Sequence, residues 1–168
     1  MLFFQALPIQ MNEYKSYTVQ EALQKLSRYC VYQDRCHQEV ERKLKDMNMI
    51  PEARAKIISE LIKHDFLNEE RFALNYVRGK FNQKGYGRVR LRQELKRRKI
   101  TEYLIIKAIK QINESEYLEK LSKLALKKFK VLGKDQSWSA KNKLKNHLIY
   151  KGFEIELIMD EINSLYKF

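Results

Sequence analysis

Apolar residues recur along most of the chain at spacings of three and four positions, which places them on one face of a helix. The first such stripe is formed by Val19, Ala22, Leu23, Leu26, Tyr29 and Cys30. Glycine (5) and proline (2) are scarce in the 168 residues, which disfavours a turn-rich β protein. The pattern predicts an all-α fold with nine helices in three groups.

Three segments of related sequence divide this helical pattern into a repeat. They span residues 35–44, 86–95 and 139–144. The leucines that close them, Leu44, Leu95 and Leu144, lie 51 and 49 residues apart, and another helical pattern follows each one. A period near fifty residues is typical of repeat arrays, in which each unit buries its apolar face partly against its neighbour. We therefore expect an elongated, curved array of three tandem three-helix units.

Turn and cap residues predict the boundaries of these units. We expect an N-terminal arm and three units over residues 1–16, 17–67, 68–113 and 114–168. Pro51 suits the first position of a helix, Asn68 suits an N-cap, and Gly152 suits a helix C-terminus. We also expect Thr101 to cap a helix and Ser115 to open the third unit.

Segment 86–92 is ambiguous, because its polar and apolar residues alternate as they do in a strand. Leu91 and Leu95 lie four positions apart, however, and the segment has the register of the corresponding helix in the other units. We therefore predict a helix over 88–99. The corresponding helix of the third unit is indicated by Trp138, Leu144 and Leu148.

Charge is unevenly distributed along the chain. The formal net charge is +13 and the pI is about 9.7. Residues 1–70 hold ten Lys/Arg against eleven Asp/Glu, whereas residues 71–168 hold twenty-four against ten. The second and third units therefore carry the whole surplus, which suits a polyanionic partner, an acidic protein groove or an anionic membrane.

Two clusters hold most of this surplus. Residues 78–99 contain ten basic side chains with Glu94 as the one acid, and residues 120–151 contain ten lysines with Asp135 as the one acid. Charge runs are often solvated helix faces, but unbalanced like charges four positions apart repel unless a partner neutralises them. We expect a binding surface formed by Arg88, Arg90, Arg92, Lys96, Arg97, Arg98, Lys99, Lys127, Lys128, Lys130, Lys141, Lys143 and Lys145. Tyr86 is a candidate to stack on a base or to enter a protein groove.

The sequence indicates no catalytic, cofactor or metal site. His37, His64 and His147 are scattered and lack Cys or carboxylate neighbours at metal-ligand spacing. The paired carboxylates lie at expected helix starts, where the helix dipole explains them. Cys30 and Cys36 are too few for a disulfide framework and fit a reducing compartment. No apolar run approaches the roughly 18 residues of a membrane span.

Three segments resemble the RecX family of regulatory proteins. Residues 67–73 (Leu-Asn-Glu-Glu-Arg-Phe-Ala) resemble the acidic-Arg-aromatic-Ala stretch that opens the family's second unit. Residues 35–40 resemble the Arg-x-His-x-x-Glu-Leu start of its first unit, and residues 87–100 resemble the Gly-x-x-x-Ile-x-x-Glu-Leu-x-x-Lys-Gly-Ile segment of its second. Cys36 stands where a Ser or Thr would cap the helix, and Lys99 stands where Gly would end it.

This resemblance implies a bacterial cytoplasmic regulator of the recombinase RecA. Such a protein is expected to lie in the helical groove of the RecA–DNA filament and to inhibit ATP hydrolysis and strand exchange. It would have no enzymatic activity and no membrane role, and it would bind single- and double-stranded DNA weakly and non-specifically. The polar, charged exterior favours a monomer. The alternative is a free-standing helical DNA- or RNA-binding protein, such as a transcription regulator, because three-helix units overlap helix-turn-helix geometry. A membrane-surface protein is a third, weaker interpretation.

Overall fold

The chain folds into helices throughout the part that the structure describes, which is residues 16–135 and 137–166 of a computed structural model. In chain order the helices are α1 (Val19–Tyr32), α2 (His37–Asp46), α3 (Pro51–Lys63), α4 (Glu69–Gly79), η1 (Lys80–Lys84), α5 (Arg88–Arg97), α6 (Glu102–Ile109), α7 (Glu114–Val131), α8 (Trp138–Lys151) and α9 (Ile155–Leu165). The short η1 segment is π-helical and continues α4, and no strand occurs in the described ranges. Apart from Ser16, the N-terminal arm expected over 1–16 lies outside those ranges.

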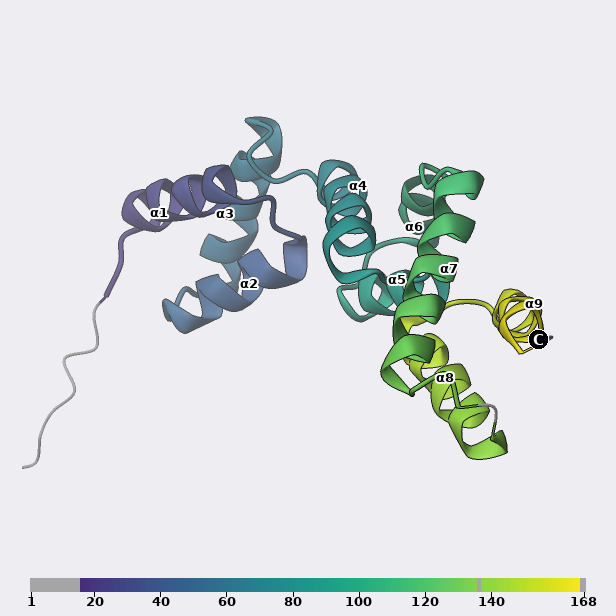
Figure 1. The fold of residues 1–168 in the computed structure, drawn as a ribbon. Coiled ribbons are helices and arrows are strands. Elements are labelled where there is room, and N and C mark those ends of the chain that lie inside the picture. The colour runs from purple at the N-terminus through teal and green to yellow at the C-terminus, as the bar shows by residue number, and fades with distance from the viewer. Residues whose placement is uncertain (1–15, 136, 167–168) are drawn as a thin grey trace, which may run out of the picture.

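The α-helices of the described residues form three successive groups of three, which Figure 1 shows along a curved, elongated row. Unit 1 contains α1, α2 and α3. Unit 2 contains α4, η1, α5 and α6, and unit 3 contains α7, α8 and α9. This arrangement confirms the predicted all-α array of tandem three-helix units, and it confirms a helix, α5, in the ambiguous alternating segment.

Several helix starts follow the chemistry of their cap residues. Pro51 is the first residue of α3, and the side chain of Asn68 accepts the backbone N–H of Arg71 at 3.0 Å. The helix α7 starts one residue before Ser115, the residue expected to open the third unit. Asn113 is its N-cap and accepts the N–H of Ser115 at 2.9 Å, so the helix begins at the intervening glutamate.

Each middle helix ends in the same left-handed turn. Asn48, Lys99 and Gly152 follow α2, α5 and α8 with φ values of 56°, 60° and 88°. Lys99 therefore adopts the backbone conformation that glycine favours, although its Cβ makes that conformation costly. Thr101 then occupies the N-cap position of α6, as predicted, but its side chain makes no capping hydrogen bond.

Hydrogen bonds that close these turns identify equivalent residues in the three units. The N–H of the residue after each turn donates to the carbonyl of Leu44, Leu95 or Leu148. The sequence repeat suggests Leu144 as the equivalent leucine of unit 3, but the hydrogen bond identifies Leu148 instead. The three equivalent leucines therefore lie 51 and 53 residues apart. The difference arises because α8 has 14 residues whereas α2 and α5 have 10 each.

The described residues contain two hydrophobic cores and not three. Unit 1 buries a cluster of its own, which includes Leu26, Leu44, Ile57 and Leu61. Units 2 and 3 bury one continuous cluster, which includes Leu91, Leu95, Ile105, Tyr117, Leu121, Leu148 and Ile158. Cys36, the N-cap of α2, is buried in this second cluster although it belongs to unit 1. Units 2 and 3 are thus one packed block, to which unit 1 is attached.

Candidate nucleic-acid interface

The first residue of α5 is held at the boundary between units 2 and 3. The Arg88 guanidinium forms ion pairs with Glu114 and Glu154. It also lies over the ring of Tyr117, 3.9 Å from the centroid, while the Arg88 N–H donates to the Tyr117 hydroxyl at 3.0 Å. That hydroxyl donates to Glu154 at 2.5 Å, and burial together with this bond raises the pKa of the phenol. Arg88 thus joins two units, and most of its charge is already neutralised.

Arg90 is used in the same junction. Its guanidinium lies 4.0 Å from the centroid of the Tyr86 ring and 4.5 Å from that of Tyr150. It also donates to the carbonyl of Tyr150 at 2.9 Å. Arg90 therefore covers one face of Tyr86, which itself packs against the core shared by units 2 and 3. The aromatic residue that the sequence suggests for stacking lies inside the junction.

Two glycines allow the backbones of units 2 and 3 to touch. The Gly87 N–H donates to the carbonyl of Lys151 at 2.8 Å, and the Val89 N–H donates to the carbonyl of Gly152 at 3.0 Å. A Cβ on Gly87 would lie 2.2 Å from the Gly152 oxygen, and a Cβ on Gly152 would lie 2.3 Å from the Cβ of Arg90. The amino end of α5 is consequently fixed against the carboxyl end of α8.

The exposed side of α5 is neutralised by the next helix. Arg92 forms an ion pair with Glu102 at the start of α6, and Lys96 pairs with the same carboxylate at 3.3 Å. Glu102 lies outside the segment in which the sequence shows one acid for ten basic residues. The excess of positive charge within residues 78–99 is therefore partly neutralised by a carboxylate from the following helix.

The remaining acid of the segment is shared by two arginines. Glu94 pairs with Arg98 at 2.9 Å and with Arg97 at 3.4 Å. Burial favours protonation of Glu94, but the hydrogen bond and charge of Arg98 outweigh it and hold the pKa of the carboxyl below its usual value. Tyr76 donates to Glu94 at 3.3 Å, and burial raises the pKa of Tyr76 to about 12. Lys99 is the exposed residue of this group that forms no ion pair within the described chain.

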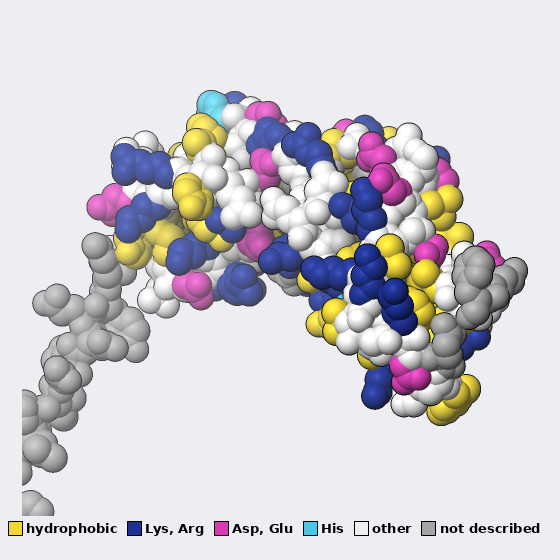
Figure 2. All heavy atoms as spheres, viewed as in Figure 1, with side chains coloured by type: hydrophobic (Ala, Val, Ile, Leu, Met, Phe, Trp, Pro, Cys, Tyr) yellow, Lys and Arg dark blue, Asp and Glu magenta, His cyan; other side chains and the backbone are white. Residues whose placement is uncertain are grey.

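Most lysines of unit 3, unlike most arginines of unit 2, form no ion pair within the described residues. Of the ten lysines in 120–151, Lys123 alone forms an ion pair within the described residues, with Glu119. The six that are predicted to bind form none, and they are Lys127, Lys128, Lys130, Lys141, Lys143 and Lys145. In Figure 2 dark blue side chains follow one another from the middle of the molecule onto unit 3, with few acids between them.

His147 of α8 lies among these lysines, and their charges affect its pKa. Burial, together with the positive charges of Lys128 and Lys151, lowers the pKa of His147. No carboxylate contributes to that shift. The positive charges around His147 are thus not offset at that side chain, whereas the arginines of unit 2 are largely paired.

Trp138 is not among the residues that the sequence suggests for binding. It is the first residue of α8, and 81% of its surface is exposed. Leu144 and Leu148 of the same helix are completely buried. Because Trp138 lies two positions before the buried Ala140, helical geometry turns it away from the buried stripe of α8. The position of Trp138 relative to this apolar stripe is the sequence signal that it is exposed.

Unit 1 is joined to unit 2 mainly through polar contacts. Asp34 accepts from Arg71 at 2.8 Å and from Asn75 at 2.6 Å, and His37 lies 2.7 Å from Glu69. Burial favours protonation of Asp34, but the hydrogen bonds from Arg71 and Asn75 outweigh it and lower the pKa of its carboxyl. This junction lacks the continuous apolar packing that joins units 2 and 3.

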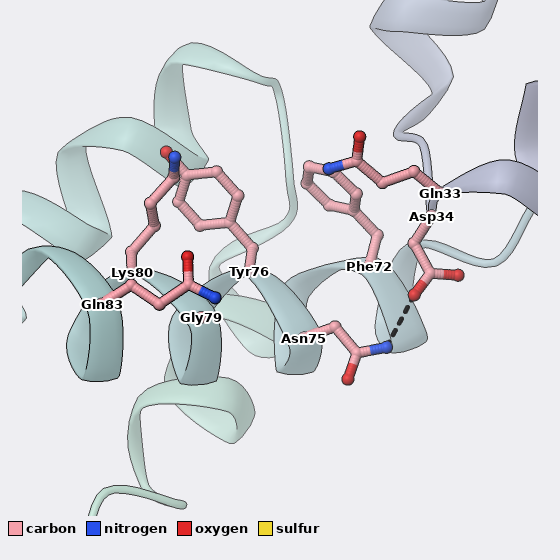
Figure 3. A pocket seen from close by; sticks show the side chains of 8 residues that line it. All are labelled: Gln33, Asp34, Phe72, Asn75, Tyr76, Gly79, Lys80 and Gln83. Carbon is pink, nitrogen blue, oxygen red and sulfur yellow. Dashed lines mark hydrogen bonds between the residues drawn. The ribbon is translucent and has the colours of Figure 1, made fainter.

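An open hollow of about 260 Å³ lies along α4 beside this junction. Figure 3 shows the rings of Phe72 and Tyr76 on one side of it, with the Asn75–Asp34 hydrogen bond at one end. Gln33, Gly79, Lys80 and Gln83 complete its lining. Its mixed polar and aromatic lining contains no cluster of groups that would perform acid–base or nucleophilic chemistry.

Other chemically active groups are dispersed. Cys30 and Cys36 are both buried free thiols, and burial raises the pKa of Cys30 to about 11. No group of three or more His, Cys, Asp or Glu residues in the described ranges is arranged to hold a metal ion. Among the described helices, none combines the length and apolar character needed to cross a membrane.

The fold defines a class of helical protein built from tandem three-helix units, here with a basic third unit. The family model described as RecX, second three-helix domain, matches residues 68–109. The model described as RecX, third three-helix domain, matches residues 114–161. The chain belongs to the RecX family.

Individual relatives agree with this assignment. "Regulatory protein RecX" of Bacillus cytotoxicus is 29% identical over 149 residues, which cover 87% of this chain and 55% of the relative. The Serratia proteamaculans protein of the same name is 31% identical over 115 residues, which cover 67% of this chain and 62% of the relative. The chain thus spans about three fifths of the length of these curated relatives.

Two solved structures have the same fold. The crystal structure of RecX from Lactobacillus salivarius superposes with a TM-score of 0.77 and 27% identity, and the match covers 89% of this chain and 97% of that one. A crystal structure of regulatory protein RecX gives a TM-score of 0.73 and 25% identity over 89% of this chain and 73% of that one.

Proposed function

We propose that this chain is a non-enzymatic regulator that binds the RecA–DNA filament in its helical groove and inhibits ATP hydrolysis and strand exchange. It acts in the cytoplasm as a monomer, modulates recombination and DNA repair, and holds DNA weakly and without sequence preference. Membership of a family of regulatory proteins supports the regulatory role. The filament and the groove are inferred from the family resemblance together with the shape and charge of the array.

One observation carries this proposal above the others, namely the unpaired lysines of unit 3. Six predicted binding lysines have no ion pair among the described residues, and two lysines of this region help to lower the pKa of His147. A surface of this kind gains free energy when phosphates replace its counterions. The corresponding arginines of unit 2 gain less, because Glu94, Glu102 and Glu154 already neutralise them.

The rigidity of units 2 and 3 explains how such binding would restrain a filament. The two units share one core and exchange backbone hydrogen bonds, so their basic residues keep fixed positions relative to one another. A rigid array that contacts more than one protomer binds best to one arrangement of those protomers. It therefore shifts the filament towards that arrangement and opposes the cycle of changes that accompanies ATP hydrolysis.

The proposal is tested by the ATPase activity of the cognate RecA on single-stranded DNA, measured with this protein at sub-stoichiometric ratios. We expect a progressive loss of ATP hydrolysis, together with a loss of strand exchange in a parallel assay. ATPase activity that stays unchanged up to an equimolar ratio would contradict the proposal.

The free-standing DNA- or RNA-binding alternative is favoured by the same lysines, and a second titration separates it. Binding to naked duplex is measured at two salt concentrations. The filament proposal predicts weak binding with a slope of log K against log salt of about −0.9 for each phosphate neutralised, and no preferred sequence. Tight binding to one duplex sequence with no effect on RecA would identify the chain as the free-standing protein.

A further inference from the structure

Trp138 is the single tryptophan of the chain, and it is 81% exposed at the start of α8. The buried stripe of α8 consists of Ala140, Leu144 and Leu148. Trp138 lies about 120° around the helix axis from Leu144, given 3.6 residues per turn. Among the described residues, its indole takes part in no hydrogen bond or ring contact. The Trp138 ring therefore packs little against the rest of the described chain and is accessible to a partner.

The other strongly exposed aromatic residues have different surroundings. Tyr32 is 86% exposed but lies in unit 1, where the charges nearly cancel. Tyr103 is 72% exposed on α6, close to Lys107, which pairs with Glu70. Tyr150 already has the guanidinium of Arg90 against its ring. Single exposed aromatics are common on protein surfaces, so the charge around Trp138 is what distinguishes it.

Three cations with no ion pair among the described residues lie close to Trp138 in the chain. Lys145 follows it by seven positions, about two helical turns, which places it on the same side of α8. Lys141 follows it by three positions, and its ammonium also lies 5.4 Å from the centroid of the Tyr166 ring. Lys134 precedes it by four positions in the turn after α7. The nearby acid, Asp135, accepts the N–H and the hydroxyl of Ser137 at 2.8 Å each, so its oxygens serve the cap of α8.

We infer that Trp138 stacks on an unpaired base of single-stranded DNA while these lysines meet the flanking phosphates. Every base has a π face, so stacking gives affinity without sequence preference. Bases inside a duplex are already stacked on one another, so the contact favours single strands over double strands. This inference rests on the proposed function, because it names the DNA strand that unit 3 would touch within the nucleoprotein.

The single tryptophan allows a direct test. Its fluorescence is excited selectively over that of tyrosine while the full chain is titrated with an oligothymidylate strand, and then with a duplex carrying the same number of phosphates. We expect the single strand to quench the fluorescence, with the same midpoint as the anisotropy of a labelled strand. The duplex should change the anisotropy without comparable quenching. Equal quenching by both ligands would overturn the inference.

A substitution gives the energetic test. Trp138→Ala should weaken binding of the single strand between about five-fold and a hundred-fold, the range measured for loss of one stacked base, and should leave duplex binding unchanged. Trp138→Phe should retain most of the affinity because it keeps an aromatic face. Tyr103→Ala is the matched control, since it removes a similarly exposed aromatic from unit 2 and should change neither ligand. Single-strand binding that survives Trp138→Ala would overturn the inference.

Failure of this inference can be told apart from failure of the proposed function. If Trp138→Ala reduces inhibition of the RecA ATPase but leaves single-strand binding intact, the indole docks on protein, and the stacking inference falls while the proposed function stands. If the wild-type chain does not inhibit RecA but its fluorescence is still quenched by single strands alone, the stacking contact stands and the proposed function falls.

Discussion

Tyr117 of α7 donates its phenolic proton to Glu154 at the start of α9, with 2.5 Å between the two oxygens, and the same hydroxyl accepts the N–H of Arg88 from unit 2. The ring is completely buried and packs against Phe81 and Phe153, with centroids 6.0 and 5.1 Å away. One side chain thus connects helices of units 2 and 3 through both polar and apolar contacts. It explains why the two units share a core and hold their basic residues in fixed positions.

Replacement of Tyr117 by phenylalanine should destabilise the chain by about 1–3 kcal/mol, because the Arg88 N–H and the Glu154 carboxylate lose their hydrogen-bond partner in a partly buried site. The measurement is the free energy of unfolding in urea. Tyr103→Phe removes a hydroxyl from a residue that is 72% exposed, and it should have almost no effect. Equal stability of the two variants would show that the hydroxyl of Tyr117 does not support the junction.

Two glycine-to-alanine substitutions should act in opposite directions. Gly87→Ala should destabilise by about 1–3 kcal/mol, because its Cβ would lie 2.2 Å from the backbone oxygen of Gly152. Gly79 has helical φ and ψ angles, and a Cβ added there would meet no atom within 4 Å, so Gly79→Ala should stabilise by about 0.5–1 kcal/mol. Thermal unfolding of both variants against wild type measures the difference. A stable Gly87→Ala variant would contradict the close approach of the two units.

Lys99→Gly should raise the stability of the chain. Lys99 has a φ of 60°, and a lysine in this left-handed conformation is less stable than glycine by about 1 kcal/mol. The expected result is a rise of a few degrees in the midpoint of thermal unfolding, about what 1 kcal/mol gives in a protein of this size. Lys96→Gly, inside α5, is the control and should lower the midpoint.

The junction of units 1 and 2 should weaken in acid. The pKa of Asp34 is lower in the folded chain than in the unfolded chain, so its contribution is fully present above the unfolded value of about 3.9. The contribution is lost as the pH falls through the folded pKa. We expect Asp34→Asn to reduce stability at neutral pH, and we expect its difference from wild type to shrink as the pH falls below the unfolded value of about 3.9. The measurement is the free energy of unfolding of both proteins across this range.

The same substitution in a chain that lacks Arg71 tests whether Arg71 causes the lowered pKa of Asp34. In an Arg71→Gln chain, the effect of Asp34→Asn should lose most of its pH dependence, because the guanidinium 2.8 Å away is a main cause of the lowered pKa. A pH dependence that persists unchanged without Arg71 would assign the shift to another group.

Local chemistry makes much of the fold predictable from the sequence. Pro51, Asn68 and Gly152 act at helix ends because their dihedral angles and side-chain oxygens suit those positions in any context. The helical spacing of Leu91 and Leu95 likewise identifies α5 against an alternating pattern. The additional turn of α8 is not predictable, because the repeat in sequence aligns the start of that helix and not its end.

The charge balance of the site depends on contacts between residues far apart in sequence. Arg88 is neutralised by Glu114 and Glu154, which lie 26 and 66 residues further along the chain. A count of acids within one segment does not include such residues. The sequence alone therefore makes units 2 and 3 equally strong candidates for the binding surface. The structure shifts the candidate surface towards the lysines of unit 3.

Two charge reversals that change net charge equally distinguish the lysines of unit 3 from the basic residues of unit 2. One chain carries Lys127→Glu, Lys130→Glu and Lys143→Glu in unit 3. The other carries Arg92→Glu, Lys96→Glu and Lys99→Glu in unit 2. Both are assayed for inhibition of the RecA ATPase on single-stranded DNA, after circular dichroism has shown that helicity is retained. We predict that the unit 3 variant loses most of its inhibition and that the unit 2 variant, whose Arg92 and Lys96 already pair with Glu102 in the wild type, loses less. Full inhibition by the unit 3 variant would contradict the role that we propose for its lysines.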